Sequence, residues 1–237
     1  MALSNVRSLS NKTLILNDFI FSAELDFMFL TCFESWLQPG DHCKLIELCP
    51  PDFDCISQPR VFGRGGGLVT VYKKQHKCTQ IPWNDFFSFE VLLLKLGGPN
   101  PVIFATFYRP PKPAGQFLSE LSESLSSLVL NHDRIVLCGD FNIHVDDLST
   151  TLATDFLSIT MFFQQHVSGK THKHGHTLDL IFSLGLRIPC VKVMDMCVSD
   201  HLCIVFSCEL LAACTASPCT EYAHVFNEHS ASKFCRV

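Results

Sequence analysis

The sequence predicts an α/β protein with mixed β-sheets, and three observations support this fold class. First, short apolar runs typical of strands alternate with amphipathic segments typical of helices through residues 1–210. Second, the apolar runs at 86–96 and 101–111 are joined by Gly97-Gly98-Pro99-Asn100, which indicates a hairpin and hence antiparallel pairing. Third, there are more strand-like than helix-like segments, so a simple doubly wound sheet is not expected.

The predicted strands are short, apolar and bounded by turn residues. The first clear one is "LDFMFLT" at 25–31, and "GRGGGLVTVYKK" at 63–74 is a glycine-rich turn that leads into another. After the hairpin, the run from Arg134 to Cys138 is expected to be a buried strand, and "HTLDLIFS" (176–183) and "SDHLCIVFSCEL" (199–210) complete the set. Together with the hairpin, these segments indicate mixed sheets.

Two segments have helical periodicity. In "QFLSELSESLSSLVL" (116–130), Leu118, Leu121, Leu125 and Leu128 recur at helical spacing, with serine and glutamate between them. The segment 150–166 predicts a second helix. From about Ala212 the alternation stops, so we expect one domain at 1–210 and a tail or linker at 211–237.

Composition limits the class of protein. With 237 residues, of which 47% are hydrophobic and 17% charged, the chain can bury a sizeable core. No apolar run approaches the ~18 residues of a membrane span, and "MALSNVRSLSNK" lacks the apolar block of a signal peptide. Thirteen cysteines, an odd number with no CxxC pair, favour reduced thiols in an intracellular protein, nuclear or cytoplasmic, over a secreted disulfide framework. The net charge of −5 excludes a wholly basic surface but permits a local basic groove.

The stretch "LCGDFNIHVDD" (137–147) ends a predicted buried strand in an acid and an amide. Side chains two residues apart point the same way along an extended chain, so Asp140 and Asn142 project together while Phe141 turns into the core. Gly139 allows a close approach of the backbone to another group. A turn built from Asp and Asn is the alternative interpretation, and this stretch alone does not decide between the two.

Polar residues of the same chemical type stand at other strand ends. Asp179 lies between Leu178 and Leu180, and a buried acid needs a partner or a metal ion. Acids, amides and one histidine that converge from separate strand ends suit Mg²⁺ or Mn²⁺ beside a phosphate. The candidate residues are Asn5, Glu34, Tyr108, Arg109, Asp140, Asn142, Asp179, Ser199, Asp200 and His201.

The order of "ESWL", "FYRPP", "GDFN", "TLDLIFS" and "SDH" resembles the endonuclease/exonuclease/phosphatase superfamily. "NVRSLSNK", "GRGGGLVTVYK" and "THKHGHTLDLIFS" resemble the apurinic-type endonuclease domain of non-LTR (LINE-like) retrotransposons in particular. The resemblance covers residues 3 to about 210. It implies a four-layer sandwich, two packed mixed β-sheets flanked by helices. It also implies Mg²⁺-dependent hydrolysis of a DNA phosphodiester, which nicks the strand that primes reverse transcription.

The resemblance also implies a role for each residue. Glu34 holds the metal with Asn5 beside it, Asp140 deprotonates the attacking water, Asn142 fixes the water or the phosphate, and Tyr108 donates its hydroxyl to a phosphate oxygen. His201 contacts another phosphate oxygen as imidazolium, Asp179 orients His201, and Asp200 is a second acid on the metal side. Contacts to phosphate or DNA are expected from Ser199, Arg109, Lys170 and Lys173.

Two other signals have competing interpretations. "THKHGH" places His172, His174 and His176 at alternate positions, which suggests either a zinc site or a basic loop that faces DNA, and no cysteine or acid completes a ligand set at the usual spacing. "GRGGG" resembles a phosphate-binding loop but lacks the Lys-Ser/Thr that follows in a P-loop, which favours a tight turn.

Two departures from the family pattern bear on activity. Cys32 and Phe33 look like an insertion in "LTCFESWL", which displaces Glu34 or requires a bulge. The first strand is expected to be truncated to "MAL", which would loosen Asn5. We therefore consider a DNA endonuclease first, a catalytically impaired remnant that keeps the fold second, and a phosphatase or phosphodiesterase of the same superfamily third. The expected partner is DNA, with no membrane, no small-molecule cofactor and a monomeric state.

Overall fold

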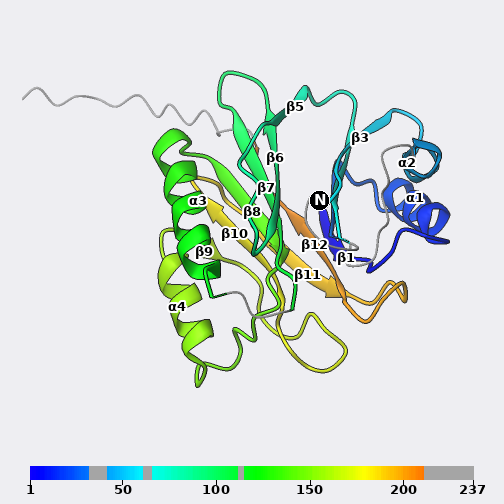
Figure 1. The fold of residues 1–237 in the computed structure, drawn as a ribbon. Coiled ribbons are helices and arrows are strands. Elements are labelled where there is room, and N and C mark those ends of the chain that lie inside the picture. Colours follow the sequence, from blue (N-terminus) through cyan, green and yellow to red (C-terminus); the bar gives the residue numbers. More distant parts are fainter. Residues whose placement is uncertain (32–41, 61–65, 112–114, 211–237) are drawn as a thin grey trace, which may run out of the picture.

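The computed structural model describes residues 1–31, 42–60, 66–111 and 115–210. Two six-stranded sheets pack face to face, and helices cover the outer face of each (Figure 1). Helices α1 (Thr13–Ser22) and α2 (His42–Leu48) lie outside the first sheet, and α3 (Phe117–Asn131) and α4 (Thr151–Ile159) lie outside the second. The four-layer sandwich is therefore confirmed.

Sheet A is the sheet covered by α1 and α2. Its strands follow the order β11, β12, β1, β2, β4, β3, and only β1 and β2 are parallel neighbours. The strand bounds are β1 (Ala2–Asn5), β2 (Phe27–Thr31), β3 (Phe53–Gln58), β4 (Leu68–Lys73), β11 (Cys190–Met194) and β12 (Cys203–Ser207).

Sheet B is the sheet covered by α3 and α4. Its strands follow the order β5, β6, β7, β8, β10, β9, and only β7 and β8 are parallel neighbours. The strand bounds are β5 (Cys78–Ile81), β6 (Glu90–Leu96), β7 (Val102–Tyr108), β8 (Ile135–Asp140), β9 (Gln164–Gln165) and β10 (Asp179–Leu184).

The main core lies between the two sheets, and β2 shows how the sequence produces it. Phe27 and Phe29 point toward sheet B, where their ring centroids lie 4.8 and 5.4 Å from that of Phe104. Met28 and Leu30, at the alternate positions, belong to the second apolar cluster, which includes α1. Because successive side chains of a strand point to opposite faces, this buried strand, apolar from Phe27 to Leu30, packs on both sides.

The hairpin of β6 and β7, helix α3 and the strand into Asp140 are confirmed. The predicted second helix at 150–166 ends at Ile159, and the two-residue strand β9 follows it. Strands β3, β5 and β11 were not predicted, since their sequences mix polar and apolar residues and their side chains are half-buried or exposed along most of their length.

The expected truncation of the first strand does not weaken its place in the sheet. β1 pairs with β12 on one side and β2 on the other, and all four of its residues are buried. Asn5, the last residue of β1, is 2% exposed. The residue that precedes α1 is Lys12, so Asn5 does not cap that helix and is free to serve the site described below.

Candidate active site

Four polar side chains form a row across one end of sheet B. Glu90 pairs with Tyr108, Tyr108 with Asp140, and Asp140 with Asp179, in direct register across β6, β7, β8 and β10. Directly paired residues point to the same face of a sheet, about 5 Å apart. The period-2 geometry of the strands therefore collects these side chains at the seam between the two sheets.

Asp140 is the centre of the row and is fully buried. Its Oδ2 accepts hydrogen bonds from the side-chain amides of Asn5, 2.7 Å away in sheet A, and Asn142, 3.1 Å away, and its Oδ1 accepts the backbone N–H of Asn142 at 3.0 Å. Burial, followed by the negative charge of Asp179, raises the pKa of Asp140 to about 7 even though these hydrogen bonds and His201 act in the opposite direction. A carboxylate with this pKa is suited to accept a proton near neutral pH.

The backbone around Asp140 explains why a glycine precedes it. Gly139 has φ +156°, and a Cβ at this position would lie 1.9 Å from the carbonyl oxygen of Phe107 on the neighbouring parallel strand. Asn142 adopts a left-handed conformation with φ +48°, which asparagine tolerates better than most residues. The predicted close approach at Gly139 is confirmed, and Phe141 is buried in the core as expected.

His201 and Asp179 form a buried pair beside Asp140. The Nδ1 of His201 lies 2.8 Å from Oδ2 of Asp179, and its Nε2 lies 3.9 Å from Oδ2 of Asp140. Burial disfavours the imidazolium, but the hydrogen bond and charge of Asp179, together with the charges of Asp140 and Asp200, outweigh it and raise the pKa of His201 to about 9. The prediction that Asp179 is buried and pairs with His201 is confirmed.

Asp200 lies next to this pair and has two cationic or polar neighbours. Its Oδ2 is contacted by a guanidinium nitrogen of Arg7 and by Nε2 of His172, the latter at 3.1 Å. Partial burial raises the pKa of Asp200, but backbone hydrogen bonding, Arg7, His201 and His172 together hold it below its ordinary value. Asp200 is therefore ionised at neutral pH.

The donor set fits a hard divalent cation. The described residues contain two clusters whose ligand atoms all lie within 4.8 Å of one another: Asp140 with Asp179 and His201, and His172 with Asp200 and His201. Within the described ranges, Oδ1 of Asp179 and Oδ1 of Asp200 are buried without a hydrogen-bond partner. Buried carboxylate oxygens beside an asparagine are ligands that suit Mg²⁺ or Mn²⁺.

Comparison with known proteins agrees with this geometry. Residues 5–201 match the model of the Endonuclease/Exonuclease/phosphatase family. The chain belongs to this family. No curated protein matches the chain by sequence. Members of the family depend on divalent metal ions, which is consistent with the acidic clusters.

Solved structures share the fold at low sequence identity. The endonuclease domain of TRAS1, a telomere-specific non-LTR retrotransposon, is 12% identical with a TM-score of 0.66, over 86% of this chain and 95% of that one. An AP endonuclease from Leishmania major is 15% identical with a TM-score of 0.65, over 86% of each chain. The 3′ phosphatase NExo from Neisseria, bound to a product DNA hairpin, is 14% identical with a TM-score of 0.60, over 88% of this chain and 98% of that one.

The structure brings six of the predicted residues together. Asn5 and Asn142 both donate hydrogen bonds to Asp140, Asp179 pairs with His201, and Asp200 neighbours His201 in the second cluster. Tyr108 occupies the row beside Asp140 and is fully buried against Leu68 and Leu92. Three predicted features lie wholly or partly outside the described residues: the Cys32–Glu34 stretch, the first three residues of "GRGGG" (63–65), and the expected tail from residue 211.

Two of the predicted phosphate contacts, Ser199 and Arg109, have backbone partners in the structure. Ser199 Oγ donates to the backbone carbonyl of Asn5 at 2.6 Å and accepts the N–H of His201 at 3.0 Å, so it ties β1 to the His201 turn. Arg109 is buried, and its guanidinium donates to the carbonyl oxygens of Phe141 and Asn142.

Arg109 therefore holds the loop that presents Asn142, and a direct contact to DNA is not the role that its geometry favours. This burial could not be predicted, because a charged residue before a proline pair is more often at the surface. Lys173 is exposed and pairs with Asp195 at 3.1 Å, and Lys170 is exposed at the same loop, so both remain candidates for DNA contact.

Sequence reasoning missed three residues of this region. His172 was considered only as part of an alternating histidine loop, yet its side chain is buried and reaches Asp200. Arg7 also reaches Asp200. Glu90 was treated as an ordinary strand residue, although it accepts the N–H of Gly67 at 2.7 Å and pairs with Arg60 at 3.1 Å. A charged residue at the start of an otherwise apolar strand was the available signal for Glu90.

Proposed function

We propose that this protein is a Mg²⁺-dependent DNA endonuclease of retrotransposon origin that hydrolyses a phosphodiester bond and nicks its target. The observation that carries the proposal is the arrangement of Asp140 between Asn5, Asn142 and His201, with Asp179 behind the histidine. This set combines a proton acceptor, a fixed cation and two amide donors at one seam between the sheets. A proton acceptor for the attacking water and a cation that stabilises negative charge on the phosphate both favour in-line hydrolysis of a phosphodiester.

The side chains divide the chemical work. Asp140, with a pKa of about 7, takes a proton from the attacking water, and Asn142 fixes the orientation of its carboxylate. His201, with a pKa of about 9, is an imidazolium at neutral pH and contacts a non-bridging phosphate oxygen through Nε2, because Asp179 occupies Nδ1. Its positive charge stabilises the additional negative charge of the five-coordinate transition state.

Asp200 and Asn5 would hold the divalent ion, and Glu34 is proposed as a further ligand from the family motif. A bound Mg²⁺ or Mn²⁺ supplies neutralisation of negative charge on the phosphate and on the leaving 3′ oxygen. Tyr108 is proposed as a neighbour of the phosphate because it stands in register with Asp140, although its hydroxyl is buried within the protein.

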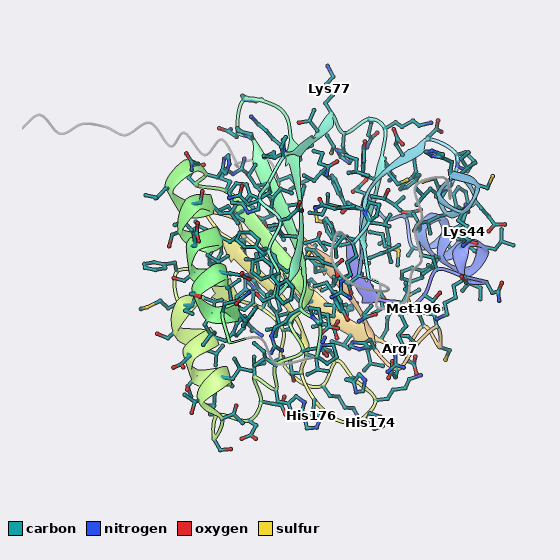
Figure 2. All side chains as sticks on the ribbon, viewed as in Figure 1. Arg7, Lys44, Lys77, His174, His176 and Met196 are labelled. Atoms are coloured by element: carbon teal, nitrogen blue, oxygen red, sulfur yellow. The ribbon has the colours of Figure 1, made fainter. Side chains whose placement is uncertain are left out.

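The case for DNA as substrate comes from the motifs and from the rim of the site. The TRAS1 endonuclease domain shares the fold, and "THKHGHTLDLIFS" resembles that subgroup. His174 and His176 reach the surface at the end of the molecule where Arg7 also lies, far from Lys77 at the other end (Figure 2). Lys170 and Lys173 belong to the same loop. We propose that this loop contacts the phosphates that flank the scissile bond.

Among the described residues, no helix has both the length and the apolar character needed to cross a membrane. The third function considered above, a phosphatase, has the NExo structure as a relative with the same fold. A substrate panel separates the two activities. We expect conversion of supercoiled plasmid to nicked circles in Mg²⁺, with ends that a DNA polymerase extends directly.

The same preparation should release little phosphate from p-nitrophenyl phosphate or from a 3′-phosphorylated oligonucleotide. If either compound releases phosphate rapidly while the plasmid stays intact, the protein is a phosphatase and the endonuclease proposal is wrong. Loss of all three activities in a folded protein would favour the catalytically impaired remnant.

A further inference from the structure

His172 lies in a turn that is fastened to the backbone around Asp200. The N–H groups of Thr171 and His172 donate to the carbonyl of His176, and the N–H of Gly175 donates to the carbonyl of His172. The N–H of Lys173 donates to the carbonyl of Asp200, and the N–H of Leu202 to that of Thr171. Backbone hydrogen bonds therefore join this turn to the segment around Asp200 that leads into β12.

The same turn also supports Asp179. The Thr171 hydroxyl accepts the backbone N–H groups of Leu178 and Asp179, at 2.9 and 3.0 Å. The ring of His172 packs edge-on against that of His201, with centroids 4.7 Å apart. His172 is 8% exposed, so its position is set by packing as well as by hydrogen bonds.

The hydrogen bonds of His172 define which ring nitrogen carries the proton. The backbone N–H of His174 donates to Nδ1 at 3.3 Å, so Nδ1 is an acceptor and has no proton. A neutral ring then carries its proton on Nε2, which lies 3.1 Å from Oδ2 of Asp200. His172 is consequently a hydrogen-bond donor to Asp200.

This tautomer argues against His172 as a metal ligand, despite its place in a cluster with Asp200 and His201. Coordination through Nε2 would move the proton to Nδ1, where it would oppose the N–H of His174. None of the clusters found in the described residues contains two of the three loop histidines, so the alternating pattern does not form a zinc site there.

The two oxygens of Asp200 have different surroundings. Oδ2 is contacted by both His172 and Arg7, whereas Oδ1 is buried without a hydrogen-bond partner in the part of the chain that the structure describes. Two donors on one oxygen fix the rotation of the carboxylate and leave the other oxygen available. A hard cation is the partner that suits such an oxygen.

We propose that His172 is a positioning residue of the nuclease site: as a neutral Nε2–H donor it holds Oδ2 of Asp200, so that Oδ1 is the oxygen offered to the divalent ion. This inference rests on the proposed function, and it gives the first histidine of "THKHGHTLDLIFS" a specific task. The role is distinct from a direct contact of His172 with DNA or metal.

The test compares two substitutions in the full-length chain. His172→Gln keeps an N–H donor near the position of Nε2, and His172→Leu keeps the volume without a donor. His132→Gln is the matched control: His132 directly follows α3, and within the described ranges its hydrogen bond is made by the backbone N–H and not by the ring. Binding of Mn²⁺ to protein without DNA is measured by electron paramagnetic resonance of the free ion, which does not depend on activity.

We expect His172→Leu to weaken Mn²⁺ binding, and to raise the Mg²⁺ concentration for half-maximal nicking, by about 10-fold or more, as is typical for groups that orient a ligand. His172→Gln should stay within about threefold of the wild type, because its amide keeps a neutral donor to Oδ2 of Asp200. The rate at saturating Mg²⁺ should change less than the metal affinity.

Two results would overturn the inference. One is unchanged Mn²⁺ binding by His172→Leu with its fold intact, and the other is an equal loss in the Leu and Gln variants. Nitrogen NMR of the wild-type histidines gives a check that needs no variant to fold: a proton on Nδ1 of His172 contradicts the tautomer. If the wild type nicks no DNA but the Mn²⁺ and NMR results hold, the proposed function fails and the positioning role stands.

Discussion

Asp179→Asn should impair nicking in a way that depends strongly on pH. The carboxylate of Asp179 lies 2.8 Å from Nδ1 of His201. Burial lowers the pKa of His201, but the neighbouring carboxylates, Asp179 first among them, raise it to about 9. The Asn side chain is nearly isosteric but neutral, so the imidazolium loses its counter-charge. The pKa of His201 should then fall toward its ordinary value of 6.5, because burial still lowers it and its main partner has lost its charge.

The expected size of the defect follows from the fraction of His201 in the imidazolium form. At pH 8 a group of pKa about 9 is about nine-tenths protonated, whereas a group of pKa 6.5 is only about 3% protonated. The variant should therefore lose about thirtyfold in rate at pH 8 and only about twofold at pH 6.5. The alkaline limb of the pH–rate profile should move to lower pH.

The assay is the initial rate of plasmid nicking in saturating Mg²⁺ across this pH range, with Asp155→Asn as control. Asp155 is an exposed residue of α4, so its variant should follow the wild-type profile. A defect of Asp179→Asn that is equally large at pH 6.5 and pH 8 would refute the charge argument. An unchanged rate at both values would remove the Asp179–His201 pair from the mechanism.

Three further predictions concern stability. Arg109→Met should lower the free energy of unfolding in urea by about 2–3 kcal/mol, because the buried guanidinium donates to two carbonyl groups. Unchanged stability with weaker DNA binding would instead support the DNA contact that was expected from the sequence. Gly139→Ala should lower it by about 3 kcal/mol or more, since its Cβ would lie 1.9 Å from a carbonyl oxygen, and a well-folded variant of wild-type stability would contradict this. Burial raises the pKa of Glu90 from 4.5 to about 7, so the folded state binds this proton more tightly than the unfolded state. The stability that this group contributes is present below pH 4.5 and is lost as the pH rises through 7, by about 3 kcal/mol relative to Glu90→Gln. Parallel curves of stability against pH for the two proteins would argue against this.

The layers of the fold and the centre of the site could be predicted because they depend on local patterns. The period-2 alternation around "LCGDFN" placed Asp140 and Asn142 on one side, and the motifs placed Asp179 and His201 with them. Edge strands such as β5 and β11 escaped prediction, because half-exposed strands lack the continuous apolar run that identifies a buried one.

The roles of Arg109 and His172 depend on contacts between residues far apart in the sequence. Arg109 is buried by the 141–142 loop and by the ring of Phe117, which lies 4.8 Å from its guanidinium carbon. His172 forms a β-bridge with His201, 29 residues further along the chain, and no local sequence signal indicates that pairing. Neither burial can be inferred from composition or periodicity.

The central claim is that Asp140 and its neighbours carry out metal-dependent phosphodiester hydrolysis. The most direct measurement is nicking of supercoiled plasmid by the full-length chain in Mg²⁺, in EDTA, and by Asp140→Asn in Mg²⁺. We expect nicked circles only from the wild type in Mg²⁺, with the variant slower by about 10³-fold or more, as expected when a general base and its charge are lost. Nicking by Asp140→Asn at the wild-type rate, or nicking that persists in EDTA, would contradict the account.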